Sequence, residues 1–216
     1  KDADTITMTA TFTETNLISG TPQIAIDYFG AGNDLTATNM TETSNKVWTY
    51  IADIPAANDG LATITITGND DAGNAVGTHT NHTFTVDNTA PGVTLTSTAS
   101  PGPTNTSPIP MTATFTEWVD GLIEGEITVG NGSVDNASLS TSDNIEWTFT
   151  VTPAGEGSVT VDIGAGAAQD ATTTGNTAAS QFSIIYDTIA PTVNITYSAT
   201  DPYKDADTIT MTATFT

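Results

Sequence analysis

The sequence predicts an all-β chain built from tandem antiparallel β-sandwich domains, and three observations support this prediction. About one residue in five is Thr, which is β-branched and packs better on a pleated sheet than in a helix. Short runs alternate apolar and polar residues, which gives a strand one buried face. The chain also repeats itself at two periods, which indicates a linear array of similar domains.

The longer repeat has a period of about 200 residues. Residues 1–13 read KDADTITMTATFT and residues 204–216 read the same letters, so the period is 204 − 1 = 203. A match of this length is not chance. We therefore expect the chain to be part of a longer polypeptide that repeats almost verbatim.

The shorter repeat divides the longer one into two related domains. The MTATFTE sequence of Met8–Glu14 recurs at Met111–Glu117. The pattern D-x-x-A-P ends at Pro91 and again at Pro191, an offset of 191 − 91 = 100 residues. Proline cannot donate a hydrogen bond to a sheet, so each of these prolines marks a boundary rather than the interior of a strand.

We place the domain boundaries just before these prolines, between Thr89 and Ala90 and between Ile189 and Ala190. Residues 1–89 then form a domain that lacks its first strand, and residues 90–189 form a complete domain. Residues 190–216 are the first strands of the next copy. The strand missing from the first domain should resemble residues 192–198.

Alternation is clearest from Ile6 to Phe12, where Thr separates successive apolar residues and predicts a half-buried strand. Similar runs predict further strands at Ile24–Tyr28, Val47–Ile51, Leu61–Thr67, Thr83–Val86, Val93–Thr96, Met111–Phe115, Ile127–Val129, Trp147–Val151, Val159–Ile163 and Phe182–Ile184. Turn sequences rich in Gly, Asn and Asp separate these runs, and no segment has a sustained helical period.

Six or seven short strands per hundred residues fit an immunoglobulin-like sandwich, although the cysteine pair of antibody domains is missing. Trp48 and Trp147 take matching positions in the two domains. We expect them to lie in the cores rather than on a binding surface.

Composition excludes several classes of function. The chain has 25 acidic residues, three Lys and no Arg, for a net charge of −22, so we expect no nucleic-acid partner. It has no Cys, which rules out disulfides and thiolate sites. Apolar runs are too short to cross a membrane, so we expect no direct membrane contact in this segment. No recognised catalytic motif is present, which predicts that the segment is not an enzyme.

The order of the motifs resembles a known family. D-x-x-A-P is followed by T-A-T-F-T-E, W-T-[YF], G-x-x-T-[IV]-x-I, a Gly-Asn turn, F-x-[IV] and a second D-x-x-A-P. This order resembles the bacterial Ig-like domains of giant tandem-repeat surface adhesins. The resemblance implies tandem immunoglobulin-like sandwiches strung into an extended array on the cell surface, with a spacer or adhesive role.

The resemblance to adhesin arrays that stiffen with Ca²⁺ also implies metal sites at the domain junctions, because Ca²⁺ takes six to eight oxygen ligands. One site would use Asp70, Asp71 and Asp87, and the other Asp170 and Asp187. The following domain could add ligands from Asp201, Asp205 and Asp207, whose repeat equivalents include Asp2 and Asp4. The alternative is that these residues only stabilise turns, and that the acidity only keeps the protein soluble.

The expected function is a structural spacer or filament segment of a long extracellular protein, involved in adhesion or fibre formation. Its partners would be neighbouring repeats, other copies in a fibre, or a ligand on a host or cell surface. One alternative is a module that binds carbohydrate or protein through Tyr28, Phe29 or Trp118. Another is a subunit that polymerises by strand exchange, although the duplicated ends favour a continuous chain.

Overall fold

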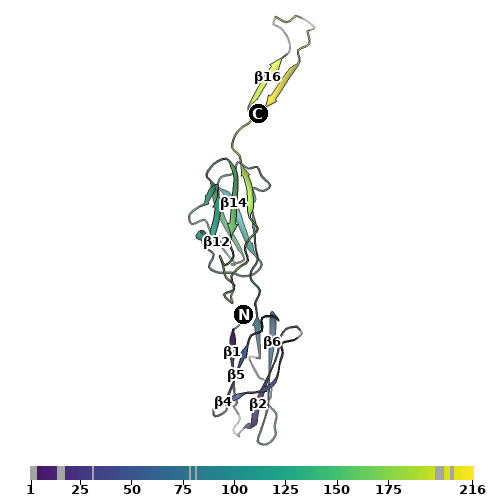
Figure 1. The fold of residues 1–216 in the computed structure, drawn as a ribbon, viewed down its shortest axis with the longest axis vertical. Helices are drawn as coiled ribbons and strands as arrows, with labels where there is room; N and C mark the ends of the chain where they lie inside the picture. Colours follow the sequence, from purple (N-terminus) through teal and green to yellow (C-terminus); the bar gives the residue numbers. More distant parts are fainter. Residues whose placement is uncertain are drawn as a thin grey trace.

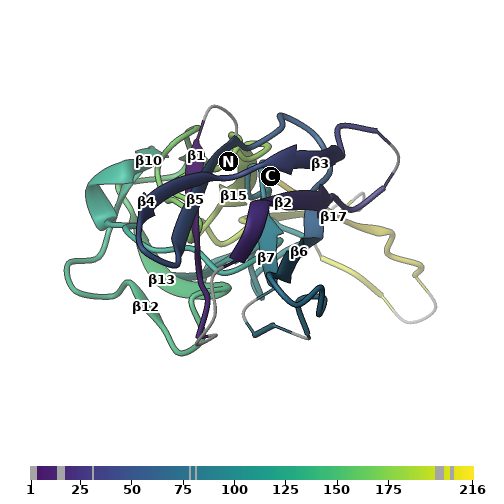
Figure 2. The same ribbon diagram turned by 90° about the horizontal axis from the view of Figure 1, so that it is seen from below.

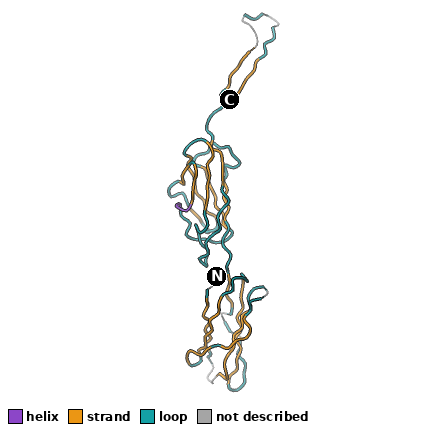
Figure 3. Tube along the Cα trace, viewed as in Figure 1, coloured by secondary structure: helices purple, strands orange, loops and turns teal. Residues whose placement is uncertain are grey.

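The computed structural model describes residues 4–13, 18–30, 32–77, 79–80, 82–197, 202–204 and 207–216. Figure 3 shows that strands dominate, and within the described residues the one helical segment is the short 3₁₀ turn η1 (Glu124–Glu126). Every strand predicted from alternation is present. The expectation of an all-β fold is therefore confirmed.

The strands form two sandwiches and a hairpin, which follow one another along the long axis of Figure 1. The first sandwich contains β1 (Thr5–Thr11), β2 (Ile18–Asp27), β3 (Leu35–Asn39), β4 (Thr41–Ser44), β5 (Val47–Asp53), β6 (Gly60–Asp70) and β7 (Thr83–Val86). The second contains β8 (Val93–Thr96), β9 (Ile109–Phe115), β10 (Ile127–Gly130), β11 (Gly132–Val134), β12 (Ser140–Thr141), β13 (Glu146–Pro153), β14 (Gly157–Ile163) and β15 (Phe182–Tyr186). The C-terminal hairpin contains β16 (Val193–Tyr197) and β17 (Met211–Phe215).

The first sandwich packs two antiparallel sheets, of order β1-β5-β4 and β3-β2-β6-β7, which appear as two layers in Figure 2. Apolar side chains on the inner faces of both sheets form one core, with Ile24 and Ile26 almost fully buried. Alternation explains this core, because every second side chain of a strand points to the same face. Trp48 packs against the core and is half-buried.

The second sandwich is built in the same way, from sheets of order β11-β13-β9-β8 and β10-β14-β15, with β12 pairing with β13. Its separate core includes Met111, Phe115 and Val161, each 2% exposed or less. Trp147 is 8% exposed, which confirms that this indole lies in the core. The predicted domain boundaries fall in the segments between β7 and β8 and between β15 and β16.

The two sandwiches differ at one edge. In the second, β9 lies between β13 and β8, with Val93 opposite Phe115. The equivalent strand of the first sandwich is β1, which carries the same MTATF sequence and pairs with β5. Among the described residues, no strand pairs with the other edge of β1. The position that β8 fills in the second sandwich therefore has no occupant in the first.

The C-terminal hairpin stands apart from both sandwiches in Figure 1. Its strands pair in register, with Val193 opposite Phe215 and Tyr197 opposite Met211. This is the register of β8 on β9. No described helix of the chain is long and apolar enough to cross a membrane.

Candidate cation site at the domain junction

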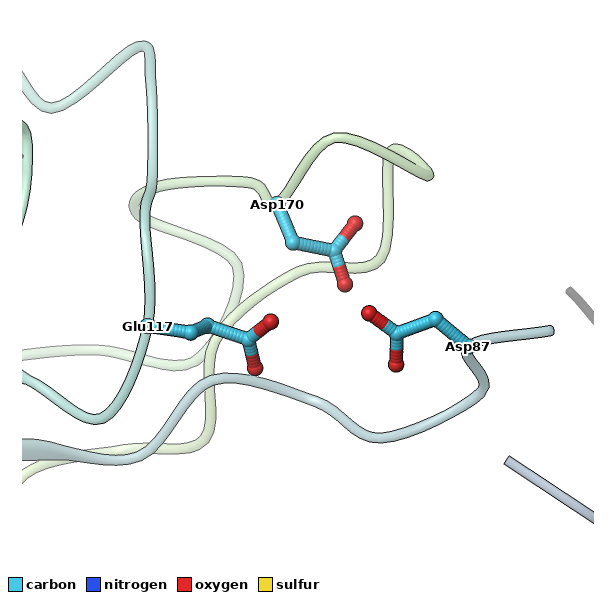
Figure 4. Close-up of side chains that lie close together, drawn as sticks. All are labelled: Asp87, Glu117 and Asp170. Carbon is cyan, nitrogen blue, oxygen red and sulfur yellow. The ribbon is translucent and has the colours of Figure 1, made fainter. Parts of the chain in front are cut away.

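Three carboxylates meet where the first sandwich joins the second. Asp87 directly follows β7, Glu117 lies two residues after β9, and Asp170 lies in the loop that follows β14. One oxygen from each lies within 4.8 Å of the others, and Figure 4 shows the three side chains turned toward a common space. Opposite oxygen ligands of a Ca²⁺ ion are separated by about 4.6–5.2 Å, so this spacing fits the ion.

The loop around Asp170 fixes its carboxylate in one orientation. Its Oδ1 accepts hydrogen bonds from the backbone amides of Thr172 and Thr174, at 2.7 and 2.9 Å, and from the Thr172 hydroxyl at 2.8 Å. Its Oδ2 is buried and has no hydrogen-bond partner, and the residue as a whole is only 5% exposed. A buried carboxylate oxygen without a partner is costly, and a bound cation would remove that cost.

The charge at this site is not balanced by protein groups. The pKa of Glu117 is raised, chiefly by burial and then by the negative charges of Asp87, Asp170 and Asp59. Like charges this close disfavour ionisation, whereas a divalent cation would favour it. The sequence supplies three Lys and no Arg to offset 25 acidic residues.

Hydrogen bonds hold the linker beside this cluster from both sides. On the side of the first sandwich, Asp59 accepts bonds from the backbone and side-chain nitrogens of Asn88, at 2.9 and 2.8 Å, and from the Thr89 hydroxyl at 2.5 Å. These bonds, that of Thr89 first, lower the pKa of Asp59. On the side of the second sandwich, Thr177 N donates to Pro91 O at 2.8 Å, and Thr116 N donates to Gly92 O at 3.0 Å.

The structure corrects how the predicted ligands are grouped. β6 and β7 are antiparallel, with Gly60 opposite Val86, so Asp87 lies at the end where β6 begins. Asp70 closes β6 at its far end, about 33 Å away for an eleven-residue strand. Asp70 and Asp71 therefore cannot share a junction with Asp87. In the same way, Gly157 opposite Tyr186 separates Asp187 from Asp170 by the length of β14.

The remaining predicted ligands have local roles or lie elsewhere. Both carboxylate oxygens of Asp70 accept bonds from Asn74, at 2.8 Å each, which closes a loop as the turn alternative expects. Asp187 accepts a bond from Ile189 N at 2.9 Å, and Asp71 is exposed. Asp207 accepts a bond from Lys204 N at 2.8 Å in the loop of the hairpin. Asp2, Asp201 and Asp205 lie outside the described residues.

Within the described residues, Asp87, Glu117 and Asp170 are the only group of three or more acidic, His or Cys residues close enough to hold one ion. Sequence patterns pointed to Asp87 and Asp170 but allotted them to different junctions, and Glu117 was missed. The position of Glu117 just after a strand was the available signal. It is the last residue of the MTATFTE repeat.

The aromatic residues proposed for ligand binding are placed differently from one another. Tyr28 is 4% exposed and belongs to the core, so its assignment to a binding surface was wrong. Phe29 and Trp118 are 62% and 45% exposed. Trp118 borders a hollow of about 480 Å³ next to the cation cluster, which Asp120, Glu126 and Asp170 also line.

Comparison with known proteins places the second sandwich in a family. A family model described as bacterial Ig-like domain matches residues 87–186. No curated protein matches the chain. The family match covers the strands of the second sandwich and also Asp87, Glu117 and Asp170.

Several solved structures are similar at low sequence identity. A tetra-tandem repeat from the extending region of a large adhesion protein is 18% identical with a TM-score of 0.37; the match covers 99% of this chain and 59% of that one. Fibronectin(III)-like modules of Clostridium thermocellum CbhA are 16% identical with a TM-score of 0.32, over 86% of this chain and 85% of that one. The Bacteroides ovatus protein SGBP-B, solved with a mixed-linkage heptasaccharide, is 16% identical with a TM-score of 0.25, over 94% and 47%.

These TM-scores are all below 0.5, so the three likenesses assign no function to this chain. The family match rests on sequence and agrees with the antiparallel two-sheet sandwich seen from β8 to β15. Residues 87–186 of this chain are therefore a bacterial Ig-like domain.

Proposed function

We propose that the chain is a structural spacer of a long repetitive protein on a cell surface, and that Ca²⁺ stiffens the junction between its sandwiches. The observation that carries the proposal is the acidic cluster at the linker: Asp87 comes from the end of the first sandwich, and Glu117 and Asp170 from the second. An ion bound to all three would tie the two domains together.

Three further features support a spacer. The near-verbatim 203-residue period suits length better than diverse recognition. The hydrogen bonds of Asp59 and Thr116 already hold the linker at both ends, so a single ion would add to an existing arrangement. The net charge of −22 keeps a long chain soluble and extended outside the cell.

Calorimetry tests the calcium site. Titrating CaCl₂ into the full chain should give a saturable heat, and at 100 times Kd the ion should stabilise the folded state by about 2.7 kcal/mol. Asp170→Asn keeps the Oδ1 hydrogen bonds but removes the charge, so the heat should be lost. Asp71→Asn is the matched control, because Asp71 is exposed and far from the cluster.

Small-angle scattering tests the stiffening. With Ca²⁺ the distribution of distances between the two sandwiches should narrow, and chelation should broaden it. The calcium proposal is wrong if the wild-type chain shows neither heat nor a change in melting temperature with chelator. A glycan that binds the chain, and no longer binds Trp118→Ala, would favour a ligand-binding module over a spacer.

A further inference from the structure

The free edge of β1 borders an apolar groove. The groove has a volume of about 810 Å³ and lies between the two sheets of the first sandwich. β1 and the residue after it line one side with Ile6, Met8, Ala10 and Phe12, and β6 and β7 line the other with Ile64, Ile66 and Phe84. In the second sandwich the equivalent space is filled by β8, whose Val93 is 7% exposed and whose Leu95 packs on the core.

The C-terminal hairpin carries a strand that matches this groove. β16 follows Pro191 as β8 follows Pro91, and Val193 and Ile195 stand where β8 has Val93 and Leu95. In the hairpin these side chains face no second sheet. Val193, Ile195 and Tyr197 are 52%, 61% and 62% exposed. A row of apolar side chains this exposed is typical of a surface that lacks its partner.

The register of the docked strand follows from the hairpin itself. β16 pairs with β17, and β17 has the same MTATF sequence as residues 8–12. At the base of the hairpin, Thr216 N donates to Thr192 O at 3.0 Å and Thr192 N donates to Thr216 O at 2.9 Å. Thr13 is the equivalent of Thr216, since 216 − 203 = 13. A strand that leaves β17 can thus form the same backbone pairs with β1.

We propose that the free edge of β1 and its groove bind strand β16 of a second copy of this chain, with Val193 opposite Phe12 and Tyr197 opposite Met8. The exchange adds what neither site has alone: β1 gains a neighbouring strand, and the apolar side chains of β16 gain a second sheet to pack on. A hairpin of two strands is only marginally stable in water, so β16 loses little by leaving it.

The geometry makes the association directional. Each copy offers one acceptor edge in its first sandwich and one donor strand near its C-terminus, so contact between copies is head-to-tail. Such a contact is heterologous and extends into open filaments unless the ends meet. Each copy carries a net charge of −22, so association should strengthen as salt screens the repulsion. The proposal does not depend on calcium.

Sedimentation velocity of the full chain in chelator, at about 0.15 M salt, tests the proposal. Oligomers should grow with protein concentration. Ile195→Asp would bury an unpaired charge in the groove, so it should weaken association by about tenfold or more. Ile189→Asp is the matched control: Ile189 is 72% exposed and lies before the strand, so association should be unchanged.

A capped chain gives a second test. Residues 190–203 attached directly in front of Lys1 reproduce the sequence that precedes residue 204, so the added strand should fill the groove from within the same molecule. This chain should remain monomeric. A synthetic peptide of residues 190–198 should likewise inhibit association of the unmodified chain.

Three results would overturn the proposal. The first is an unmodified chain that stays monomeric up to about 1 mM. The second is equal association of the Ile195→Asp and Ile189→Asp variants, and the third is continued association of the capped chain. Thermal melts of both sandwiches in each variant keep a loss of association distinct from a loss of folding.

Discussion

The two sandwiches carry nearly the same strand in different surroundings. On β9, Ile109, Met111, Ala113 and Phe115 are each 2% exposed or less. On β1 and just after it, the equivalent Ile6, Ala10 and Phe12 are only half-buried, and Met8 is 7% exposed. The difference is the neighbouring strand β8, which only the second sandwich has among the described residues. Burial of a strand in this fold is therefore set by its neighbour as much as by its own sequence.

The largest expected effect comes from the phenylalanines of this strand. Phe115→Ala should destabilise the second sandwich by about 3–5 kcal/mol, because the ring is fully buried. Phe12→Ala should cost the first sandwich less than about 2 kcal/mol, because the open groove already exposes part of the ring to water.

Urea unfolding monitored by tryptophan fluorescence separates these effects, since Trp48 lies in the first sandwich and Trp118 and Trp147 lie in the second. Equal losses for the two variants would show that β1 is as well covered as β9. The comparison would then fail.

A buried amide distinguishes the second sandwich further. Asn176 is 2% exposed; its side chain accepts a bond from Ala168 N at 2.8 Å and donates to Gly164 O and Thr177 O, at 2.9 and 2.7 Å. Asn176→Ala leaves these backbone groups without partners and should cost about 1–3 kcal/mol. In the first sandwich the equivalent position is the half-buried Val76, so Val76→Ala should cost less in the same urea experiment.

The two junctions allow a smaller comparison. Asp59 holds Asn88 and Thr89 at the first junction, and Glu156 holds Thr188 at the second. Asp59→Ala should lower the unfolding free energy of the first sandwich by about 0.5–1.5 kcal/mol. Glu156→Ala should leave the first sandwich unchanged. Proteolysis between Asp87 and Pro91 should be faster only in Asp59→Ala, and equal rates in both variants would contradict this role.

The smallest expected effects are those of pH. The pKa of Asp135 is lowered by hydrogen bonds from the hydroxyls of Thr150 and Thr152. A lowered pKa gives stability that is present above the ordinary value of 3.8 and is lost as the pH falls through the folded value. Asp135→Asn should therefore flatten the acid side of the stability curve of the second sandwich.

Glu117 has the opposite sign. Because its pKa is raised above 4.5, the unfolded chain ionises first, and stability falls as the pH rises through 4.5 toward the folded value. In chelator, Glu117→Gln should remove this fall, and saturating Ca²⁺ should remove it in the wild-type chain. Denaturant melts between about pH 4 and 7 measure both, and a fall that persists in Glu117→Gln would assign it to another group.

Much of the fold is predictable from the sequence, because alternating apolar residues mark the core strands. β3 and β4 were missed. All four residues of β4 are exposed, and most of β3 is too, so backbone pairing holds them rather than an apolar face. A strand without a buried face leaves no alternation to detect.

The site was predictable in part. Asp87 and Asp170 stand out as acidic residues in loops, but loop position alone does not say which end of a domain they occupy. Consecutive antiparallel strands place the end of one beside the start of the next, and this rule would have separated Asp70 from Asp87. The unpaired Oδ2 of Asp170 depends on side-chain geometry, which no sequence pattern encodes.

Amide hydrogen exchange on β1 tests the missing neighbour strand most directly. Phe12 N donates to Lys46 O on the β5 side, so by alternation the amides of Met8, Ala10 and Phe12 face β5, and those of Thr9 and Thr11 face the free edge. In the 216-residue chain, at concentrations where it is monomeric, the amides of Thr9 and Thr11 should exchange fast while the other three are protected. Attaching residues 190–203 in front of Lys1 should protect all five. Slow exchange at Thr9 and Thr11 in the monomer, or fast exchange there in the extended chain, would contradict a free edge on β1 that β16 can fill.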